Sequence, residues 1–253
     1  MEFSVAEVMA GLDRNEFYIE YMPIVSLASG SCVAAEALVR WKKGDEVVSP
    51  LKFIPAFEEG PLIGLVTYWL IEKIGAELGD WMRQNPTFHI SINVPPELFG
   101  RGGLLYAAKQ AHLADLYPQL VLELTERGVP DKISLEGMRF AQRMGLGIAI
   151  DDIEGGNLNL LLLARSQVDY IKLDKSVVDT IDEHGFQGPI SQEVAQVVTL
   201  GSPLLVAEGI ETELQLTSLR KMGVQLGQGW LISKALGRDE FLVFYENCHK
   251  KQN

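Results

Sequence analysis

Residues 120–152 read LVLELTERGVPDKISLEGMRFAQRMGLGIAIDD, and the order of apolar and polar residues in this segment predicts the fold class. It opens with a short β-rich run, Leu120–Leu124, and continues with an amphipathic helical segment, Leu135–Met144. A second β-rich run, Leu146–Ile150, follows directly. Short apolar runs that alternate with helical segments are typical of parallel strands joined by helical crossovers.

The same alternation recurs along the whole chain. The other β-rich runs are Phe17–Val25, Ala34–Val39, Phe88–Val94, Tyr170–Leu173, Leu204–Ala207 and Gly223–Leu226. The other helical segments are Leu51–Glu58, Leu62–Arg83, Gly103–His112, Ser176–Ile181, Ile190–Thr199 and Glu213–Met222. Strands that alternate with helices in this way predict an α/β protein, a closed (β/α)8 barrel of the TIM type, which commonly takes about 250 residues.

The start of this barrel is expected to be irregular. Phe17–Val25 and Ala34–Val39 are separated mainly by Leu27–Ser31, which is too short for a helical crossover. We therefore expect one antiparallel strand near the N-terminus. No low-complexity tract, repeat or Pro/Ser-rich linker divides the sequence, so we expect a single domain over residues 1–253 with its core at about 17–245.

Composition excludes several classes of protein. The chain has 253 residues, 47% hydrophobic and 22% charged, which predicts a globular protein with a sizeable core. Its net charge of −12 opposes binding to nucleic acid polymers. Apolar stretches such as Leu160–Ala164 are too short to span a membrane, and the start lacks a leader pattern, so we expect a cytoplasmic protein. Cys32 and Cys248 are expected to be ordinary thiols, because neither has a metal-binding spacing.

Polar residues lie in or just after nearly every β-rich run. In order they are Glu36, Asn93, Glu123, Asp151, Asp152, Lys172, Glu208, Glu211 and Gln228. The carboxyl ends of barrel strands converge on one face, so residues far apart in sequence are expected to share one site. Any single acidic residue at a strand end could instead be a helix cap or a solvated loop residue.

A role as helix caps or solvated loop residues explains single acidic residues better than it explains all of them together. Glu36, Glu123 and Asp151 lie inside or directly after apolar runs, where an unpaired carboxylate would be costly. With six carboxylates counted as −6, and Arg40 with Lys172 as +2, the set carries about −4, which two divalent ions would neutralise. Oxygen ligands without His or Cys favour Mg²⁺ or Mn²⁺, with Ca²⁺ expected to compete without supporting turnover.

Several segments occur in the order typical of one family. They are Tyr21-Met-Pro-Ile-Val, Glu36-Ala-Leu-Val-Arg-Trp, Ser91-Ile-Asn-Val, Glu123-Leu-Thr-Glu, Asp151-Asp, Tyr170-Ile-Lys-Leu-Asp, Ala207-Glu-Gly-Ile-Glu and Gln228-Gly-Trp. From about Phe17 to Phe241 the chain thereby resembles the EAL-domain cyclic di-GMP phosphodiesterases. The resemblance implies a barrel with one antiparallel strand, a homodimer that forms near the loop after Asp152, and hydrolysis of cyclic di-GMP to linear pGpG.

The resemblance also implies a role for each site residue. Glu36, Asn93, Glu123 and Asp151 would hold one ion, and Asp151 with Asp152 a second, with Glu208 nearby. Lys172 would contact the attacking water, and Glu211 and Gln228 would complete the site. Arg40 would take a substrate phosphate, Asp174 would lie near the nucleotide, and Glu126 would brace the loop after Asp152.

Two departures from the family pattern leave alternatives open. The usual Asp-Asp-Phe-Gly-Thr-Gly is here Asp151-Asp152-Ile153-Glu154-Gly155-Gly156, and Met22 replaces the usual Gln. The chain is therefore either a phosphodiesterase, or a weakly active or inactive domain that binds cyclic di-GMP or a protein partner. An enolase-like barrel is a third reading, but such enzymes usually need a capping domain for which this chain has no room.

Overall fold

The computed structural model describes residues 3–58, 62–95, 98–99, 102–125, 132–153, 168–186 and 190–250. The strands within these ranges are β1 (Phe17–Ser26), β2 (Cys32–Lys43), β3 (Glu46–Val48), β4 (His89–Asn93), β5 (Leu120–Thr125), β6 (Gly147–Ile153), β7 (Tyr170–Leu173), β8 (Leu204–Ala207) and β9 (Leu226–Gly227). The helices are α1 (Val5–Asp13), α2 (Pro50–Glu58), α3 (Leu62–Gln84), α4 (Gly103–Gln110), the 3₁₀ helix η2 (Ala114–Gln119), α5 (Lys132–Arg143), α7 (Lys175–Val178), α8 (Ile190–Leu200), α9 (Glu213–Met222) and α10 (Arg238–Lys250).

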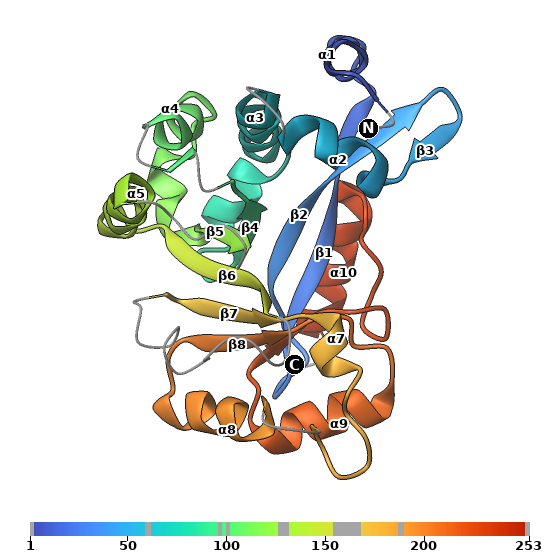
Figure 1. Ribbon diagram of the computed structural model, residues 1–253, viewed down its shortest axis with the longest axis vertical. Helices are drawn as coiled ribbons and strands as arrows, with labels where there is room; N and C mark the ends of the chain where they lie inside the picture. Colours follow the sequence, from blue (N-terminus) through green and yellow to red (C-terminus); the bar gives the residue numbers. More distant parts are fainter. Residues whose placement is uncertain are drawn as a thin grey trace.

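The strands close into a barrel, as the sequence predicts. The sheet order is β1-β9-β8-β7-β6-β5-β4-β2-β3, and the additional pairing of β1 with β2 closes the ring. The strands β2 and β4 to β9 run parallel in their consecutive pairings, whereas β1 is antiparallel to both β2 and β9. Figure 1 shows the helices outside these strands, with α4 and α5 on one side and α8 and α9 on another. The prediction of one antiparallel strand near the N-terminus is confirmed.

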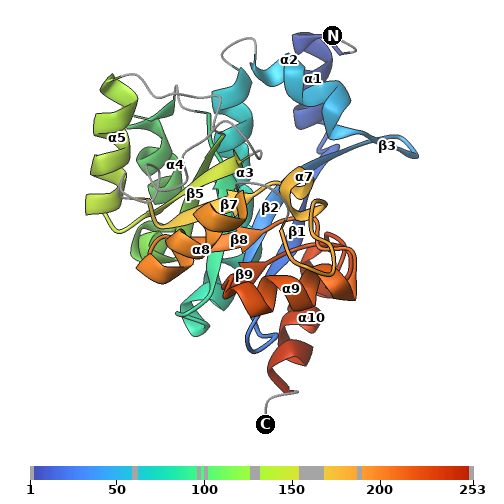
Figure 2. The ribbon, with the colours of Figure 1, turned by 60° about the horizontal axis from the view of Figure 1, so that its bottom comes forward.

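The strand β2 continues past the barrel as a hairpin with β3, through the pairing of Trp41 with Val48. A separate apolar cluster surrounds this extension. Trp41 is fully buried and stacks on Phe17 with ring centroids 5.0 Å apart, and Val8 of α1 and Phe53 of α2 pack in the same cluster. These contacts explain why α1 and the hairpin lie together above the barrel in Figure 2.

The main core lies between the strands and the helices around them. On α3, Ile74, Leu78 and Met82 repeat at a spacing of four residues, and all three are fully buried. Phe241 of α10 is also fully buried, with its ring 5.7 Å from that of Phe88. Among the helices that the structure describes, none has the length and apolar character needed to cross a bilayer.

Some elements differ from the predictions. The last β-rich run was expected at Gly223–Leu226, but Gly223 is the left-handed C-cap of α9 (φ 81°), and the strand occupies Leu226–Gly227. The elements α1, β3, η2 and α10 were not predicted. The domain limits of 1–253 and the core limits of about 17–245 remain predictions.

Candidate functional site

The side chains of the site come from inside the barrel. Along β5, Leu122 and Leu124 are buried in the main apolar core, so Glu123 between them points to the other face of the sheet, toward the barrel axis. On β7, Lys172 lies in the same way between Ile171 and Leu173. Alternation along a strand therefore places polar side chains inside the barrel without exposing their apolar neighbours.

The centre of the site is the ammonium group of Lys172, which is 1% exposed. Its Nζ atom lies within ion-pair distance of four carboxylates. The distances are 2.7 Å to Glu208 Oε1, 2.8 Å to Glu123 Oε2, 3.1 Å to Asp151 Oδ2 and 3.2 Å to Glu36 Oε2. Residues from β2, β5, β6, β7 and the end of β8 thus meet at one point, as the sequence predicts.

Two amides hold these carboxylates in place. Asn93 Nδ2 donates to Glu36 Oε1 at 2.9 Å. Gln228 Nε2 donates both to Glu36 Oε2 at 2.9 Å and to Glu208 Oε1 at 3.1 Å. The carbonyl oxygen of Gln228 is buried and has no hydrogen-bond partner in the part of the chain that the structure describes. That oxygen is a further acceptor beside the cluster for a water or a cation.

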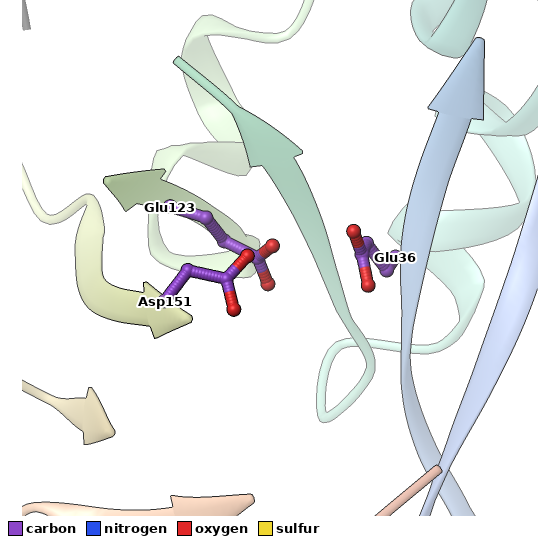
Figure 3. Close-up of side chains that lie close together, drawn as sticks. All are labelled: Glu36, Glu123 and Asp151. Atoms are coloured by element: carbon purple, nitrogen blue, oxygen red, sulfur yellow. The ribbon is translucent and has the colours of Figure 1, made fainter. Parts of the chain in front are cut away.

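The residues fit a hard metal ion. Figure 3 shows Glu36, Glu123 and Asp151 with their carboxylates turned toward one another, and one oxygen from each lies within 4.8 Å of the others. Ligands on opposite sides of an octahedral Mg²⁺ ion are separated by about 4.2 Å, so small side-chain adjustments suffice. The carboxylates also gather round an ammonium in the structure, and the donor set holds only oxygens, which suits a divalent cation of the Mg²⁺ or Mn²⁺ type.

Burial and charge act on Lys172 in opposite directions. Burial lowers the pKa of the ammonium, but the charges of Glu123, Glu208, Glu36 and Asp151 raise it more, and its pKa ends well above its usual range. The lysine is therefore protonated at neutral pH. A protonated lysine cannot accept a proton from a water, and the expected contact of Lys172 with an attacking water stays a prediction.

The pKa values of the carboxylates in the cluster shift in different directions. Burial raises the pKa of Glu123 well above its usual range, because the charge of Lys172 does not offset the burial and the neighbouring carboxylates. Burial likewise raises the pKa of Glu208 to about 8. For Glu36, burial is outweighed by the charge of Lys172 and by hydrogen bonds from Gln228 and Asn93, so its pKa is lowered. Without a cation besides Lys172, part of the cluster keeps protons that a metal ion would displace.

The other expected site residues have partners outside this cluster. Glu211 is 41% exposed at its side chain and pairs with Lys175 of α7 at 3.0 Å, so it does not join the carboxylates around Lys172. Arg40 Nε donates to Glu20 Oε2 at 2.7 Å. Asp174 is the N-cap of α7 and accepts a hydrogen bond from the backbone N–H of Ser176 at 2.8 Å, which lowers its pKa against the effect of burial.

The strand register places Arg40 on the face of the site. Glu36 and Arg40 are four residues apart on β2, so both point to the same side. On the neighbouring strand β1, Met22 pairs with Glu36 and Glu20 pairs with Leu38. Leu38 lies between Glu36 and Arg40 on β2 and points to the same face as both, so Met22 and Glu20 border this face. Sequence reasoning identified Arg40 and Met22 but missed Glu20. The side chain of Asp152 and the whole of Glu126 lie outside the described residues, as does the loop at 154–167.

Comparisons with known proteins agree with this geometry. Residues 5–235 match the EAL domain family. A probable cyclic di-GMP phosphodiesterase of Escherichia coli (strain K12), PdeB, is 38% identical over 239 residues, which are 93% of this chain and 46% of PdeB. A second, PdeD of the same organism, is 33% identical over 247 residues, which are 95% of this chain and 45% of PdeD. The chain thus spans less than half the length of these curated relatives.

Solved structures show the same fold. The PaMucR phosphodiesterase in complex with c-di-GMP superposes with a TM-score of 0.80 at 27% identity, over 94% of this chain and 98% of that one. The EAL enzyme Bd1971 in its cGMP-bound form gives a TM-score of 0.82 at 27% identity, over 95% of this chain and 68% of that one. With the barrel, its antiparallel first strand and the family match over residues 5–235 all in agreement, the chain belongs to the EAL domain family.

Proposed function

We propose that this chain hydrolyses cyclic di-GMP to linear pGpG in a reaction that depends on divalent metal ions. The observation that carries the proposal is the group of buried carboxylates of Glu36, Glu123 and Asp151 around the ammonium of Lys172. The names of the relatives PdeB and PdeD support the choice of substrate. Family membership removes the enolase-like alternative.

Two Mg²⁺ or Mn²⁺ ions are the cofactors that we propose. Glu36, Asn93, Glu123 and Asp151 would hold the first. This is supported by one oxygen from each of the three carboxylates lying within 4.8 Å of the others, and by the contact of Asn93 with Glu36. Asp151 and Asp152 would hold the second. When bound, such ions ionise a water near neutral pH and stabilise the charge that grows on a phosphate. Ca²⁺ is expected to inhibit, since it prefers more ligands and longer distances than this compact oxygen set provides.

The protein's own side chains would position the reaction. Lys172 carries a proton and so orients the attacking water and screens its charge. Glu208 and Gln228 border the cluster beside Glu36, which fits a role in holding that water and the metal ligands. In-line attack forms a new P–O bond and breaks the P–O3′ bond, which opens the cyclic dinucleotide. Glu211 acts at a distance, through its ion pair with Lys175 on the rim helix α7.

Substrate binding would use the surface beside the cluster. Arg40 lies on the same face of β2 as Glu36 and is proposed to bind a phosphate of the dinucleotide. Asp174, at the start of α7, is proposed to lie near the nucleotide. Glu126 is proposed to brace the loop after Asp152, and that loop is the proposed contact of a homodimer. A cytoplasmic location fits a nucleotide substrate and remains part of this proposal.

The test is direct. Purified protein is incubated with cyclic di-GMP and Mn²⁺ or Mg²⁺, and linear pGpG is measured by chromatography. We expect product with either ion, and none after chelation or in Glu36→Gln. Tight binding of cyclic di-GMP without product would instead identify a receptor. If the protein neither binds nor hydrolyses the nucleotide with any divalent ion, the nucleotide function is wrong and a protein partner becomes the alternative.

A further inference from the structure

The loop after β8 is tied to the helix α7 by one buried side chain. Gln215, in the first turn of α9, is 7% exposed. Its Oε1 atom accepts from the backbone N–H of Glu211 at 2.8 Å and from that of Thr212 at 3.0 Å. Its Nε2 atom donates to Oδ1 of Asp179, the C-cap of α7, at 3.2 Å. One amide therefore bridges two segments that leave the neighbouring strands β7 and β8.

Lys175 closes these contacts into a ring at the rim of the barrel. Its Nζ atom lies 3.1 Å from Asp179 Oδ1 and 3.0 Å from Glu211 Oε1. The stem of Lys175 crosses Gly209, where an added Cβ atom would lie 2.6 Å from Lys175 Cγ. The backbone of Gly209 has φ 65°, which also favours glycine. We call the following four residues the rim ring: Gln215, Asp179, Lys175 and Glu211.

The two segments that the rim ring joins carry Lys172 and Glu208. Lys172 is on β7, and α7 begins three residues after it. Glu208 directly follows β8, and its backbone N–H donates to the carbonyl of Leu173 at 3.0 Å. The contact between Lys172 Nζ and Glu208 Oε1, at 2.7 Å, is the shortest of the four ion pairs around Lys172. The rim ring therefore fixes the spacing of the two segments whose side chains make this contact.

The buried amide contributes more to this link than the ion pairs do. The side chains of Lys175, Asp179 and Glu211 are between 41% and 48% exposed, and exposed ion pairs contribute little because water and salt screen them. The polar atoms of Gln215 are shielded from water, so leaving them unpaired would be costly. With Thr212 alone, Gln215 forms the capping box of α9. Its bonds to Asp179 and to the N–H of Glu211 go beyond what that cap requires.

We propose that Gln215 is a positioning residue of the site: through Asp179 it holds α7 against the loop after β8, and so sets Glu208 beside Lys172. The proposal rests on the proposed function, in which both of these side chains take part in the reaction. Gln215 acts through Glu208 and not on the reacting atoms. Loss of the link should slow the reaction without weakening the binding of substrate or ions, since Arg40 and the proposed metal ligands lie on other strands.

Gln215→Glu breaks the link and leaves the helix cap in place. The new carboxylate still accepts from the N–H groups of Glu211 and Thr212, but it has no proton to donate to Asp179 and repels that carboxylate. Adding Asp179→Asn supplies an amide that donates to the new carboxylate, so the double variant exchanges donor and acceptor across the same contact. Asp179→Asn alone is the matched control, because its amide oxygen still accepts from Gln215.

Steady-state hydrolysis of cyclic di-GMP with Mn²⁺ gives the first readout. We expect kcat of Gln215→Glu to fall by roughly tenfold or more, because small displacements of groups in a reaction site have effects of this size. KM and the Kd for Mn²⁺ should stay at the wild-type values. In the double variant kcat should return to near the wild-type value, and in Asp179→Asn alone it should stay there.

Hydrogen exchange of backbone amides, followed by NMR without nucleotide, gives a second readout that needs no turnover. The N–H of Glu208, which donates to Leu173, should exchange faster in Gln215→Glu and regain its protection in the double variant. The N–H of Leu216, which donates to the carbonyl of Thr212, reports on the cap of α9 and should be unchanged in all variants.

Full kcat in Gln215→Glu, or a double variant that recovers neither kcat nor the protection of Glu208, would overturn the proposal. Faster exchange at Leu216 in Gln215→Glu would also overturn it, because the residue would then be needed for the helix cap alone. A wild type that yields no pGpG contradicts the proposed function, and the exchange rates of Glu208 then decide the positioning role by themselves.

Discussion

Lys172 Nζ lies 2.7 Å from Glu208 Oε1, and the same ammonium also contacts the carboxylates of Glu36, Glu123 and Asp151. One buried positive charge thus contacts four acidic groups and offsets part of the repulsion between them. Removing one partner from a buried ion pair costs about 3–5 kcal/mol, because the remaining charges lose their compensation. This relationship makes Lys172 important for stability as well as for the proposed chemistry.

We therefore predict that Lys172→Met lowers the free energy of unfolding of the metal-free protein by about 3–5 kcal/mol and reduces turnover to background. Saturating Mn²⁺ should raise the thermal midpoint more in the variant than in the wild type, because the ions replace the lost charge. Thermal unfolding with and without Mn²⁺ measures both effects. An unchanged midpoint in the metal-free variant would show that the ion pairs contribute no net stability.

Glu123→Gln tests the metal ligand set. The substitution keeps the size of the side chain but removes a charged oxygen ligand, so the Kd for Mn²⁺ should rise by at least about tenfold. Glu77→Gln is the control, since Glu77 is a partly buried carboxylate that accepts a hydrogen bond from Tyr21 outside the cluster. Isothermal titration calorimetry with Mn²⁺ checks the prediction. Equal affinities in the two variants would remove Glu123 from the ligand set.

The raised pKa of Glu208 predicts how stability depends on pH. Its pKa is about 8 in the folded protein, against a usual value of 4.5. Between these values the folded state keeps a proton that the unfolded chain has lost, so the stability of metal-free protein should fall as pH rises from 5 to 8. Glu123 contributes in the same direction. The dependence should be weaker in Glu208→Gln, and weaker in wild type with saturating Mn²⁺, which displaces the protons.

Thermal midpoints at a series of pH values decide this point. A metal-free wild type whose midpoint rises over this range would show that the cluster is fully ionised in the folded state. The Glu208→Gln curve then identifies which part of the slope comes from this one residue.

The barrel could be predicted because its strands have a recognisable sequence pattern. Runs such as Leu120–Leu124 and Leu146–Ile150 are short, apolar and followed by helical patterns, so both the parallel order and the antiparallel first strand were predictable. The last strand was displaced because Gly223 ends α9, and only two residues pair after it. The helices α1 and α10 were missed, since their apolar faces fit tertiary neighbours such as Trp41 and Phe88 rather than a simple pattern.

The site was predictable only where a residue interrupts an apolar strand. Glu123 and Lys172 lie between buried aliphatic residues, which marks them as inward and in need of partners. Glu211 lacks this signal, since it follows the end of β8 by four residues, and in the structure it pairs with Lys175 instead of joining the cluster. Glu20 gives no signal of its own, since its importance comes from the register that sets it beside Arg40.

The altered loop after Asp152 gives a gain-of-function prediction. Replacing Ile153-Glu154-Gly155 by Phe-Gly-Thr restores the family pattern and removes a negative charge two residues after Asp152 in the sequence, so turnover of cyclic di-GMP should rise. Affinity for cyclic di-GMP should change less, because Arg40 and the ions supply much of the phosphate binding. Adding Lys172→Ala to the restored loop should still abolish turnover. If turnover stays at background while binding is tight, the loop is not the limiting feature, and Met22 becomes the next position to restore to Gln.

Variants of the ion pair between Glu20 and Arg40 distinguish two effects on substrate binding: the charge of Glu20 and the position of the Arg40 guanidinium. Arg40→Ala should raise KM by about 10–100-fold, as a charged hydrogen bond contributes about 1.5–3 kcal/mol, and should change kcat less. In Glu20→Gln the amide oxygen still accepts from Arg40 Nε, so the guanidinium stays in place while a negative charge beside the phosphate is lost. KM should then fall by a few-fold at low ionic strength, and the difference from wild type should shrink as salt screens the charge. Steady-state kinetics at two salt concentrations distinguishes the possibilities. If Glu20→Gln raises KM as Arg40→Ala does, the full carboxylate is needed to hold Arg40, and Glu20 is a positioning residue rather than a source of repulsion.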